Sequence, residues 1–232
     1  MKLNKPKFIY FDLDDTLLNH KKAEQNGLRD VYNHFDELKS VSIEELLTTY
    51  HTINKGLWEA YGRGEIDRKI LHRRRFEETF SELNINKDLY EDAGAVYMNY
   101  YRNHWEWLAN AKEVFDKIVA VYPVGIITNG FAETQRMKIA QFEFEKVARH
   151  IVISEDIGVM KPHPKIFDYA TDLVGYNRED ILYVGDSLSS DVKGGKSAGW
   201  QVAWFTKHVS EEGKELADLV FDDFDVLMEA LS

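Results

Sequence analysis

KFIYFDLDDT, residues 7–16, joins a short apolar run directly to a cluster of carboxylates. Residues 8–11 are rich in strand-forming side chains, and Asp12, Asp14 and Asp15 follow at once. Acids this close together repel one another, so their charges need compensation. A bound divalent cation would compensate them by coordination. An acidic turn or helix start is the simpler alternative, because Asp and Thr are common caps.

The composition is that of an ordinary globular protein, with 44% hydrophobic and 30% charged residues among 232. This length allows one large domain, or a core with a smaller inserted module. The sequence contains no apolar run long enough to span a bilayer, and the apolar stretch after the basic residues 1–6 is too short for a signal peptide. A cytoplasmic location without membrane association is therefore expected. The absence of cysteine excludes disulfides and thiolate chemistry.

The formal net charge of -11 argues against a nucleic-acid polymer as partner, since such binding draws on basic surface. One basic run, RKILHRRR at residues 68–75, stands against this background. It is either a solvated helix face or a positive wall that attracts an anionic substrate.

Apolar β-type runs alternate with helical stretches through the second half of the chain. These runs occupy residues 8–11, 124–128, 151–153, 181–184, 201–205 and 219–221. Alternation of helices with nearly continuous apolar strands predicts an α/β fold with a buried, Rossmann-like parallel sheet.

The segment 19–107 breaks this alternation because it has helical periodicity almost throughout, at residues 43–61, 67–83 and 87–107. A crossover between parallel strands needs only one helix, so a longer run of helices must form a core of its own. We therefore predict a sheet core made of residues 1–18 and 108–232, with an inserted α-helical cap at 19–107. The aromatic side chains that we expect in the core of this helical insert are Tyr97, Tyr100, Tyr101, Trp105 and Trp107.

Ligands of a doubly wound sheet bind beyond the carboxyl ends of its strands, so the residues after each strand are the candidates for a site. In chain order they are Asp12 and Asp14, Thr128 and Asn129, Lys161, and finally Asp186 and Asp191. Each segment alone could be a turn, a cap or a surface lysine. Their convergence on one sheet edge is the more specific indication.

Phosphoryl transfer is the chemistry that uses this set of groups. Asp12 can attack phosphorus and form an aspartyl-phosphate, and Asp14 can protonate the leaving oxygen and later activate water. Asp12 and Asp186 are hard oxygen ligands suited to Mg²⁺. The histidines show no zinc-ligand spacing such as His-Glu-x-x-His.

The remaining candidates suit the phosphate itself. The Thr128 hydroxyl, Asn129 and backbone N–H groups can hold phosphate oxygens, while Lys161 supplies a fixed positive charge against the transition state. Together with the cation, that ammonium lets several carboxylates stay ionised beside a phosphate dianion.

With these segments in order, the chain resembles the haloacid dehalogenase-like hydrolase superfamily over nearly its whole length. DLDDT at 12–16 is similar to the first motif of that superfamily and Thr128 to the second. Lys161 is similar to the third, and GDS at 185–187 with Asp191 to the fourth. The helical insert resembles the first cap type of the superfamily, a four-helix bundle that closes as a lid over the active site.

The resemblance implies a role for each carboxylate. Asp12 would be nucleophile and metal ligand, Asp14 would be acid/base with its carbonyl on the metal, and Asp186 would be the third protein ligand. Asp191 would act on the metal through water or by orienting its neighbours. Asp14 also argues against the dehalogenase and phosphonatase branches, which resemble the family but lack a carboxylate there.

At finer grain the chain resembles the pyrimidine 5′-nucleotidase subfamily, which is linked to the removal of noncanonical nucleoside monophosphates. The similar segments are TNGF at 128–131, SEDIG at 154–158, GDSLSSD at 185–191 and LWEAYGRG at 57–64. Arg75 and Trp58 are the cap residues that could contact a base or sugar.

We therefore expect a Mg²⁺-dependent phosphatase that hydrolyses a small phosphorylated metabolite, a nucleoside 5′-monophosphate being the first candidate. A sugar phosphomutase or a sugar-phosphate phosphatase of the same fold is the alternative. A non-catalytic phospho-receiver is an alternative from another class, but its phosphorylated Asp follows a middle strand and it carries no helical insert. The sequence leaves open the physiological ester, the cap residues that select it and the oligomeric state.

Overall fold

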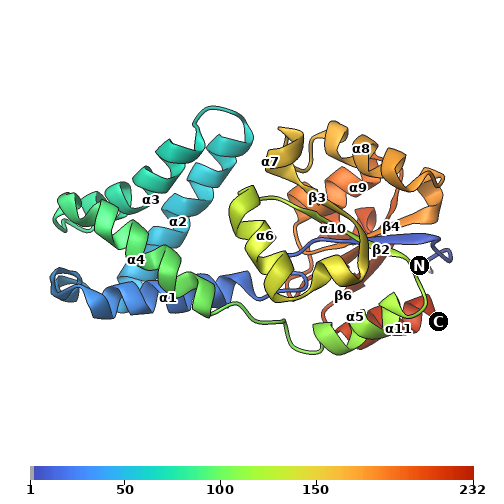
Figure 1. Ribbon diagram of the computed structural model, residues 1–232, viewed down its shortest axis with the longest axis horizontal. Coiled ribbons are helices and arrows are strands. Elements are labelled where there is room, and N and C mark those ends of the chain that lie inside the picture. The colour runs from blue at the N-terminus through green and yellow to red at the C-terminus, as the bar shows by residue number, and fades with distance from the viewer. Residues whose placement is uncertain (1–2) are drawn as a thin grey trace. The chain divides into compact units, whose positions relative to one another are not determined.

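The computed structural model describes residues 3–232, apart from the side chain of Lys87, and divides the chain into two compact units (Figure 1). One unit combines the chain up to Asn19 with Trp107–Ser232, and the other is His20–Glu106. The two segments that lead out of and back into the first unit run side by side, where the Leu108 amide donates to the Leu17 carbonyl at 2.9 Å.

A parallel sheet forms the centre of the first unit, with the strand order β3-β2-β1-β4-β5-β6. Its strands are β1 (Phe8–Phe11), β2 (Val124–Thr128), β3 (Ala148–Ile153), β4 (Ile181–Gly185), β5 (Gln201–Phe205) and β6 (Leu219–Phe221). The predicted α/β class with a Rossmann-like parallel sheet is thus confirmed. Strand β3 begins before the predicted residue 151 because it lies at the sheet edge, where its first residues are partly exposed and not purely apolar.

Helices cover both faces of the sheet, and this explains its continuous apolar strands. Ile9 and Phe11 of β1 pack with α5 (Ala111–Val119) and α11 (Phe224–Leu231) on one face. Phe8 and Tyr10 face the opposite way, toward α8 (Pro164–Val174) and α9 (Lys193–Ser197). Figure 1 shows these pairs of helices on opposite sides of the strands.

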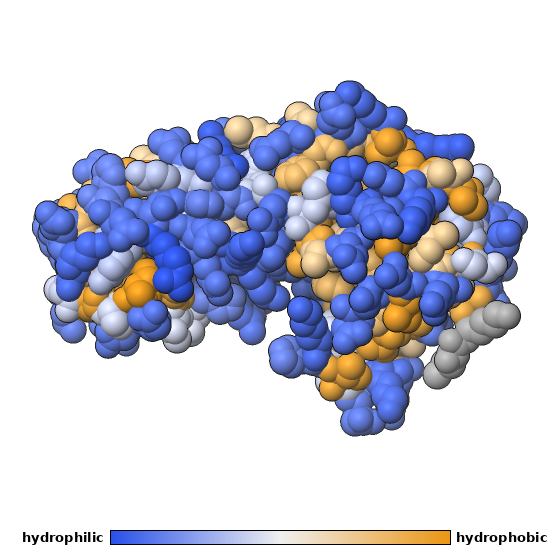
Figure 2. All heavy atoms as spheres, turned by 90° about the horizontal axis from the view of Figure 1, so that it is seen from below, coloured by the Kyte–Doolittle hydropathy of each residue, from blue (hydrophilic) through white to orange (hydrophobic). Residues whose placement is uncertain are grey.

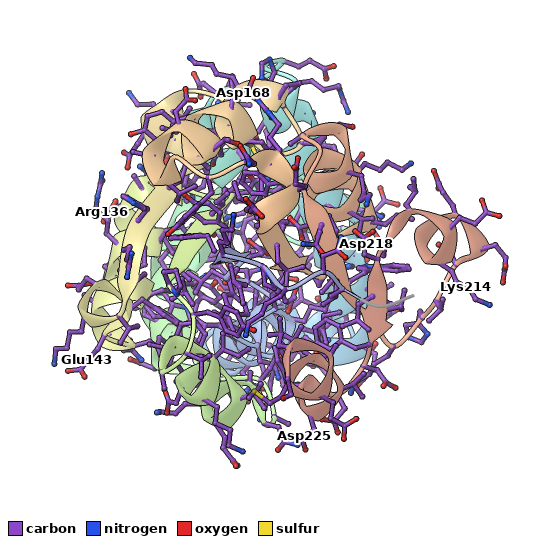
Figure 3. The ribbon with its side chains drawn as sticks, turned by 90° about the vertical axis from the view of Figure 1, so that its right-hand side faces the viewer. Arg136, Glu143, Asp168, Lys214, Asp218 and Asp225 are labelled. Carbon is purple, nitrogen blue, oxygen red and sulfur yellow. The ribbon has the colours of Figure 1, made fainter. Side chains whose placement is uncertain are left out.

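Shorter helices complete the first unit around the sheet. They are α6 (Ala132–Gln141), α7 (Ser154–Ile157), α10 (Glu211–Leu216) and the π-helical turn η5 (Leu188–Val192), with 3₁₀ turns η3 (Phe144–Lys146) and η4 (Arg178–Asp180). Viewed from its right-hand side in Figure 3, the unit carries labelled charged side chains such as Arg136, Asp168 and Asp225 at its periphery.

The second unit is a bundle of helices with an aromatic core. Its elements are α1 (His20–His34), α2 (Ile43–Gly62), α3 (Arg68–Glu82) and α4 (Tyr90–Asn103), with 3₁₀ turns η1 (Asp36–Ser40) and η2 (Lys87–Leu89). A capping box between Ser42 and Glu45 starts α2, and the Asp67 side chain accepts from the Ile70 amide at 2.8 Å to start α3.

Three of the five aromatic side chains expected in the core of the bundle are buried there, whereas Tyr100 is only partly buried. Tyr97, Tyr101 and Trp105 are buried, and the rings of Tyr97 and Tyr101 stack with centroids 5.5 Å apart. Trp107 was wrongly expected there. Helix α4 ends at Asn103, and by Trp107 the chain has returned to the sheet unit. There the ring centroids of Trp107 and Phe144 lie 5.1 Å apart.

The basic run on α3 separates into solvated and buried parts. Arg73 and Arg74 form ion pairs with glutamates one turn further along the helix, as a solvated face would. Arg75 is only 5% exposed; its guanidinium donates to His72 Nδ1 at 2.9 Å and lies 5.1 Å from the Tyr97 ring centroid. Arg75 is therefore part of the bundle interior.

Surface hydrophobicity is dispersed on the face that Figure 2 presents, where small orange areas are interrupted by hydrophilic side chains. Large exposed apolar residues such as Val121, Tyr169 and Val209 come from different parts of the chain. Among residues 3–232, every helix is too short or too polar to cross a membrane.

The close contact between β1 and β2 generates a test of this packing. A Cβ added at Gly125 would lie 2.4 Å from Tyr10 Cε1 and 2.9 Å from the His150 carbonyl oxygen. Tyr10 is fully buried and stacks on Trp200, so it has little room to move. We expect Gly125→Ala to lower the free energy of unfolding by about 1–3 kcal/mol in urea titrations.

Gly56→Ala on α2 is the opposite-sign control, because a Cβ there meets no atom within 4 Å. It should raise helix stability by about 0.5–1 kcal/mol. Unchanged or increased stability in Gly125→Ala would show that the β1–β2 contact is looser than described.

Candidate active site

The candidate residues meet because β1 lies between β2 and β4 in the sheet. Asp12 directly follows β1, Thr128 ends β2, and Asp186 directly follows β4. The Asp12 amide continues the ladder by donating to the Val184 carbonyl at 2.8 Å. The carboxyl edge of the central strands is therefore where the predicted side chains converge, as doubly wound sheets require.

Lys161 is the centre of a buried polar cluster at this edge. Its ammonium lies 2.6 Å from Asp12 Oδ1, 2.8 Å from Asp191 Oδ1 and 2.7 Å from the Tyr183 hydroxyl. The Ile127 carbonyl accepts from it at 3.1 Å. The Lys161 side chain is only 2% exposed, so its charge needs these partners.

The charges in this cluster perturb one another strongly. Burial raises the pKa of Asp12 to about 7, and the Asp191 carboxylate adds to the increase, while the Lys161 ammonium opposes it. Burial would lower the pKa of Lys161, but Asp12 and Asp191 outweigh that effect and hold it above its ordinary value. Lys161 therefore stays charged. A further positive charge beside Asp12 would favour the ionised form of the Asp12 carboxyl group.

Three carboxylates here could hold a metal ion. Asp12, Asp186 and Asp191 each present an oxygen, and these oxygens lie within 4.8 Å of one another. Thr16 donates to Asp186 Oδ1 at 3.5 Å, and the Ser187 amide donates to Asp191 Oδ2 at 2.9 Å. A set of hard, orientated oxygens fits a cation such as Mg²⁺.

The Asp14 side chain contacts α6. Lys138 Nζ lies 2.6 Å from Asp14 Oδ1 and 2.9 Å from Oδ2, and Gln135 Nε2 donates to Oδ2 at 3.0 Å. Neither Gln135 nor Lys138 was among the residues expected from the sequence. Their indication was a spacing of three on a helix that starts just after Thr128, which puts both on one face.

The residues that end β2 support the neighbouring groups. The Thr128 hydroxyl accepts from Gln135 Nε2 at 2.5 Å. Asn129 braces Lys161, because its Oδ1 accepts from the Lys161 amide at 2.8 Å and its Nδ2 donates to the Lys161 carbonyl at 3.1 Å. The phosphate contacts of Thr128 and Asn129, like the metal contact of the Asp14 carbonyl, remain predictions.

The segment after β3 anchors the start of α6. Ser154 Oγ accepts from the Gly130 amide at 3.1 Å, and the Glu155 carboxylate accepts from the Ala132 amide at 2.7 Å. A carboxylate at a helix N-terminus is favourable because it meets unpaired N–H groups and the positive end of the helix dipole. The position of α6, and of the side chains it carries, is thereby tied to the sheet edge.

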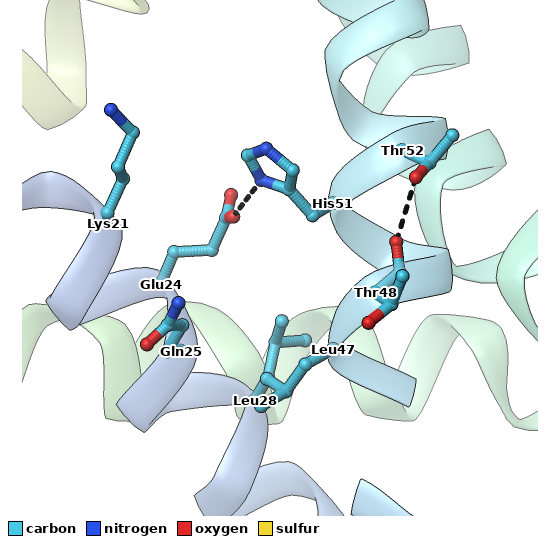
Figure 4. A pocket seen from close by; sticks show the side chains of 8 residues that line it. All are labelled: Lys21, Glu24, Gln25, Leu28, Leu47, Thr48, His51 and Thr52. Atoms are coloured by element: carbon cyan, nitrogen blue, oxygen red, sulfur yellow. Dashed lines mark hydrogen bonds and ion pairs between the residues drawn. The ribbon is translucent and has the colours of Figure 1, made fainter. Parts of the chain in front are cut away.

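The helical unit contains a separate polar pocket between α1 and α2, with a cavity volume of about 280 Å³ (Figure 4). Its lining side chains are Lys21, Glu24, Gln25, Leu28, Leu47, Thr48, His51 and Thr52. The buried Glu24 carboxylate accepts from Asn54 Nδ2 at 2.9 Å and lies 3.2 Å from His51 Nδ1. This pocket was not anticipated from the sequence.

The Glu24 cluster carries opposed pKa shifts. Burial would raise the pKa of Glu24, but His51, His20 and Asn54 together lower it below its ordinary value. The hydrogen bond that His51 donates to Glu24 raises the pKa of His51, while partial burial, Lys21 and Lys55 oppose that increase.

Comparisons with known proteins agree with this arrangement. A family model described as haloacid dehalogenase-like hydrolase matches residues 9–205. The pyrimidine 5′-nucleotidase YjjG of Escherichia coli is 32% identical over 211 residues, covering 90% of this chain and 90% of that protein. The glyceraldehyde 3-phosphate phosphatase of Pyrococcus furiosus is 29% identical over 234 residues, covering 97% of this chain and 92% of that protein.

A solved structure of a similar protein has the same fold as this chain. The crystal structure of YfnB from Bacillus subtilis, bound to magnesium, superposes with a TM-score of 0.82 at 25% identity. The superposition covers 99% of this chain and 100% of that chain. The similarity therefore includes the helical insert as well as the sheet unit.

The Glu24–His51 pair predicts a pH-dependent stability. Because the pKa of Glu24 is lowered in the folded protein, its ionised carboxylate stabilises the folded state above pH 4.5, the ordinary pKa. This stabilisation is lost as the pH falls through the lowered pKa. Because the pKa of His51 is raised in the folded protein, its protonated ring stabilises the folded state below pH 6.5, the ordinary pKa. This stabilisation is lost as the pH rises through the raised pKa. The pair should therefore stabilise most between these two values. The effect should be modest, because the His51 side chain is 57% exposed.

We expect His51→Gln to lower the Tm at pH 5.5 and to have a smaller effect at pH 9. His208→Gln, which replaces an exposed histidine of the other unit, is the control and should show no such difference. A Tm decrease of equal size at both pH values would mean that His51 acts by packing and not by charge.

Proposed function

Since the chain belongs to the haloacid dehalogenase-like hydrolase family and is a phosphomonoesterase, we propose that it is a Mg²⁺-dependent phosphatase of small phosphorylated metabolites. The observation that carries the proposal is the buried contact between Lys161 and Asp12, set beside the carboxylates of Asp186 and Asp191. This arrangement puts a nucleophile, a fixed cation and a set of metal ligands at one point of the sheet edge.

Asp12 is the proposed nucleophile. Its carboxylate oxygen would attack phosphorus and form a P–O bond, while the ester P–O bond breaks and the alcohol leaves. The Lys161 ammonium, held by its carboxylate and hydroxyl partners, would offset the negative charge that builds up on the phosphoryl oxygens. Because this cation is already in place, it needs no reorganisation during the reaction.

Asp14 is the proposed acid/base. In the first step it would give a proton to the leaving oxygen. In the second it would take a proton from the water that attacks the aspartyl-phosphate, so that the P–O bond to Asp12 breaks and inorganic phosphate leaves. Asp12 and Asp14, which are two positions apart in the first motif, would thereby serve both half-reactions.

Mg²⁺ would be held by Asp12 and Asp186, with Asp191 adjoining, because these oxygens are hard donors grouped within 4.8 Å. The bound ion would supply Lewis-acid polarisation of the phosphoryl oxygens and partial charge neutralisation. Thr16 and Ser187 support the same set by hydrogen bonding to Asp186 and Asp191.

For the substrate, we propose a nucleoside 5′-monophosphate, with a pyrimidine base as the first choice. The support comes from the similarity to the pyrimidine 5′-nucleotidase of Escherichia coli.

A sugar-phosphate phosphatase is the second candidate. It is favoured by the similarity to the glyceraldehyde 3-phosphate phosphatase of Pyrococcus furiosus, which covers 97% of this chain. Both candidates share the proposed chemistry of Asp12 and Asp14 and differ only in the leaving group.

Metal-dependent release of phosphate from p-nitrophenyl phosphate tests the reaction. We expect activity with Mg²⁺ that EDTA removes, and a loss of at least about 10³-fold in kcat for Asp12→Asn, because the amide is a poor nucleophile. Asp186→Asn should instead raise the Mg²⁺ concentration needed for half-maximal activity. Wild-type rates in Asp12→Asn would rule out Asp12 as the nucleophile.

A panel of phosphate esters ranked by kcat/KM tests the substrate. Pyrimidine nucleoside 5′-monophosphates should rank above purine nucleotides and above glyceraldehyde 3-phosphate. If the triose phosphate ranks first, the second candidate is correct. Interconversion of sugar phosphates without net release of phosphate would instead identify a phosphomutase.

A further inference from the structure

We propose that Lys138 and Gln135 of α6 are positioning residues for the acid/base Asp14, an inference that rests on the proposed phosphatase function. The two side chains engage both oxygens of the Asp14 carboxylate: Lys138 contacts Oδ1 and Oδ2, and Gln135 contacts Oδ2. Gln135 lies 121 residues and Lys138 lies 124 residues from Asp14 along the chain, so only the fold brings them together.

Lys138 is unlike the surface lysines of this protein. Its side chain is 2% exposed, whereas Lys112, Lys117 and Lys146 pair with acids on the surface with at least half of the side chain exposed. Burying an ammonium is unfavourable unless a carboxylate and hydrogen bonds compensate for it. Lys138 therefore ties the Asp14 carboxylate to α6 more firmly than an exposed pair would.

Gln135 connects the acid/base to the end of β2. Its Nε2 donates to Asp14 Oδ2 at 3.0 Å and to the Thr128 hydroxyl at 2.5 Å. Gly130 makes room for this side chain, since a Cβ at its position would lie 3.1 Å from Gln135 Cγ and Cδ, and its φ of +144° disfavours other residues. The acid/base and the predicted phosphate-binding hydroxyl thus belong to one hydrogen-bonded group.

The consequence concerns the leaving group. An alkoxide that leaves from a nucleoside 5′-monophosphate is strongly basic, so the ester bond breaks readily only if Asp14 is in position to give it a proton. The p-nitrophenolate ion is a weak base and can leave without that proton. Because proton transfer needs the carboxyl group within hydrogen-bond reach of the oxygen, loss of its supports should affect the two esters unequally.

The experiment compares Lys138→Met with wild type under saturating Mg²⁺, using uridine 5′-monophosphate and p-nitrophenyl phosphate. The rate of alcohol release in the first turnover is measured, because this step does not include hydrolysis of the aspartyl-phosphate. We expect the rate for the nucleotide to fall at least about 10²-fold, and the rate for p-nitrophenyl phosphate to fall less than about tenfold. The KM values should change little, and Lys138→Arg should restore most of the lost rate.

Arg136→Met is the matched control, because Arg136 is on the same helix but pairs with Asp156 at the surface and points outward in Figure 3. It should leave both rates unchanged. Gln135→Leu is the second variant and should show the same selective loss if Lys138→Met does not fold.

Equal losses for the two esters in the first turnover, or no loss for either, would overturn the inference, since a purely structural ion pair cannot distinguish leaving groups. These results differ from what would be seen if the proposed phosphatase function itself were wrong. In that case wild-type protein would release no phosphate from either ester, whereas failure of the inference leaves wild-type activity intact.

Discussion

The buried ammonium of Lys161 is the constraint on which the rest of the sheet edge depends. Its position between the carboxylates of Asp12 and Asp191 allows two acids to remain in a nearly dry environment. Holding it there requires Tyr183 from inside β4 and the Asn129 amide clamped on the Lys161 backbone. Many of the groups around the proposed nucleophile Asp12 therefore serve to hold the Lys161 ammonium in place.

A second buried lysine, Lys138, gives the two acids of the first motif different electrostatic environments. Asp12 contacts Lys161, whose ammonium also bonds to groups of β2 and β4, and Asp14 contacts Lys138 on α6. Each carboxylate has its own cation, although they lie two residues apart in the chain. Because the two environments differ, the same residue type can serve as nucleophile in one case and as proton carrier in the other.

Much of the fold could be predicted because its determinants are local. Apolar runs bounded by polar strand ends placed β1, β2, β5 and β6 correctly. The edge strand β3 was predicted too short, because partial exposure admits polar residues and removes the apolar pattern. Trp107 was assigned to the wrong core, because an aromatic residue at helical spacing does not reveal where the helix ends.

By itself the sequence determined the α/β class, the family and the strand-end residues, since strand patterning and short motifs are encoded over a few neighbouring positions. Only the tertiary structure decided which charge meets which. Arg75 belongs to the interior of the helical unit, Asn129 braces Lys161, and Lys138 reaches Asp14 across 124 residues of chain. A charged side chain has the same local pattern whether it faces water or a partner, so its partner is specified by packing and not by sequence spacing.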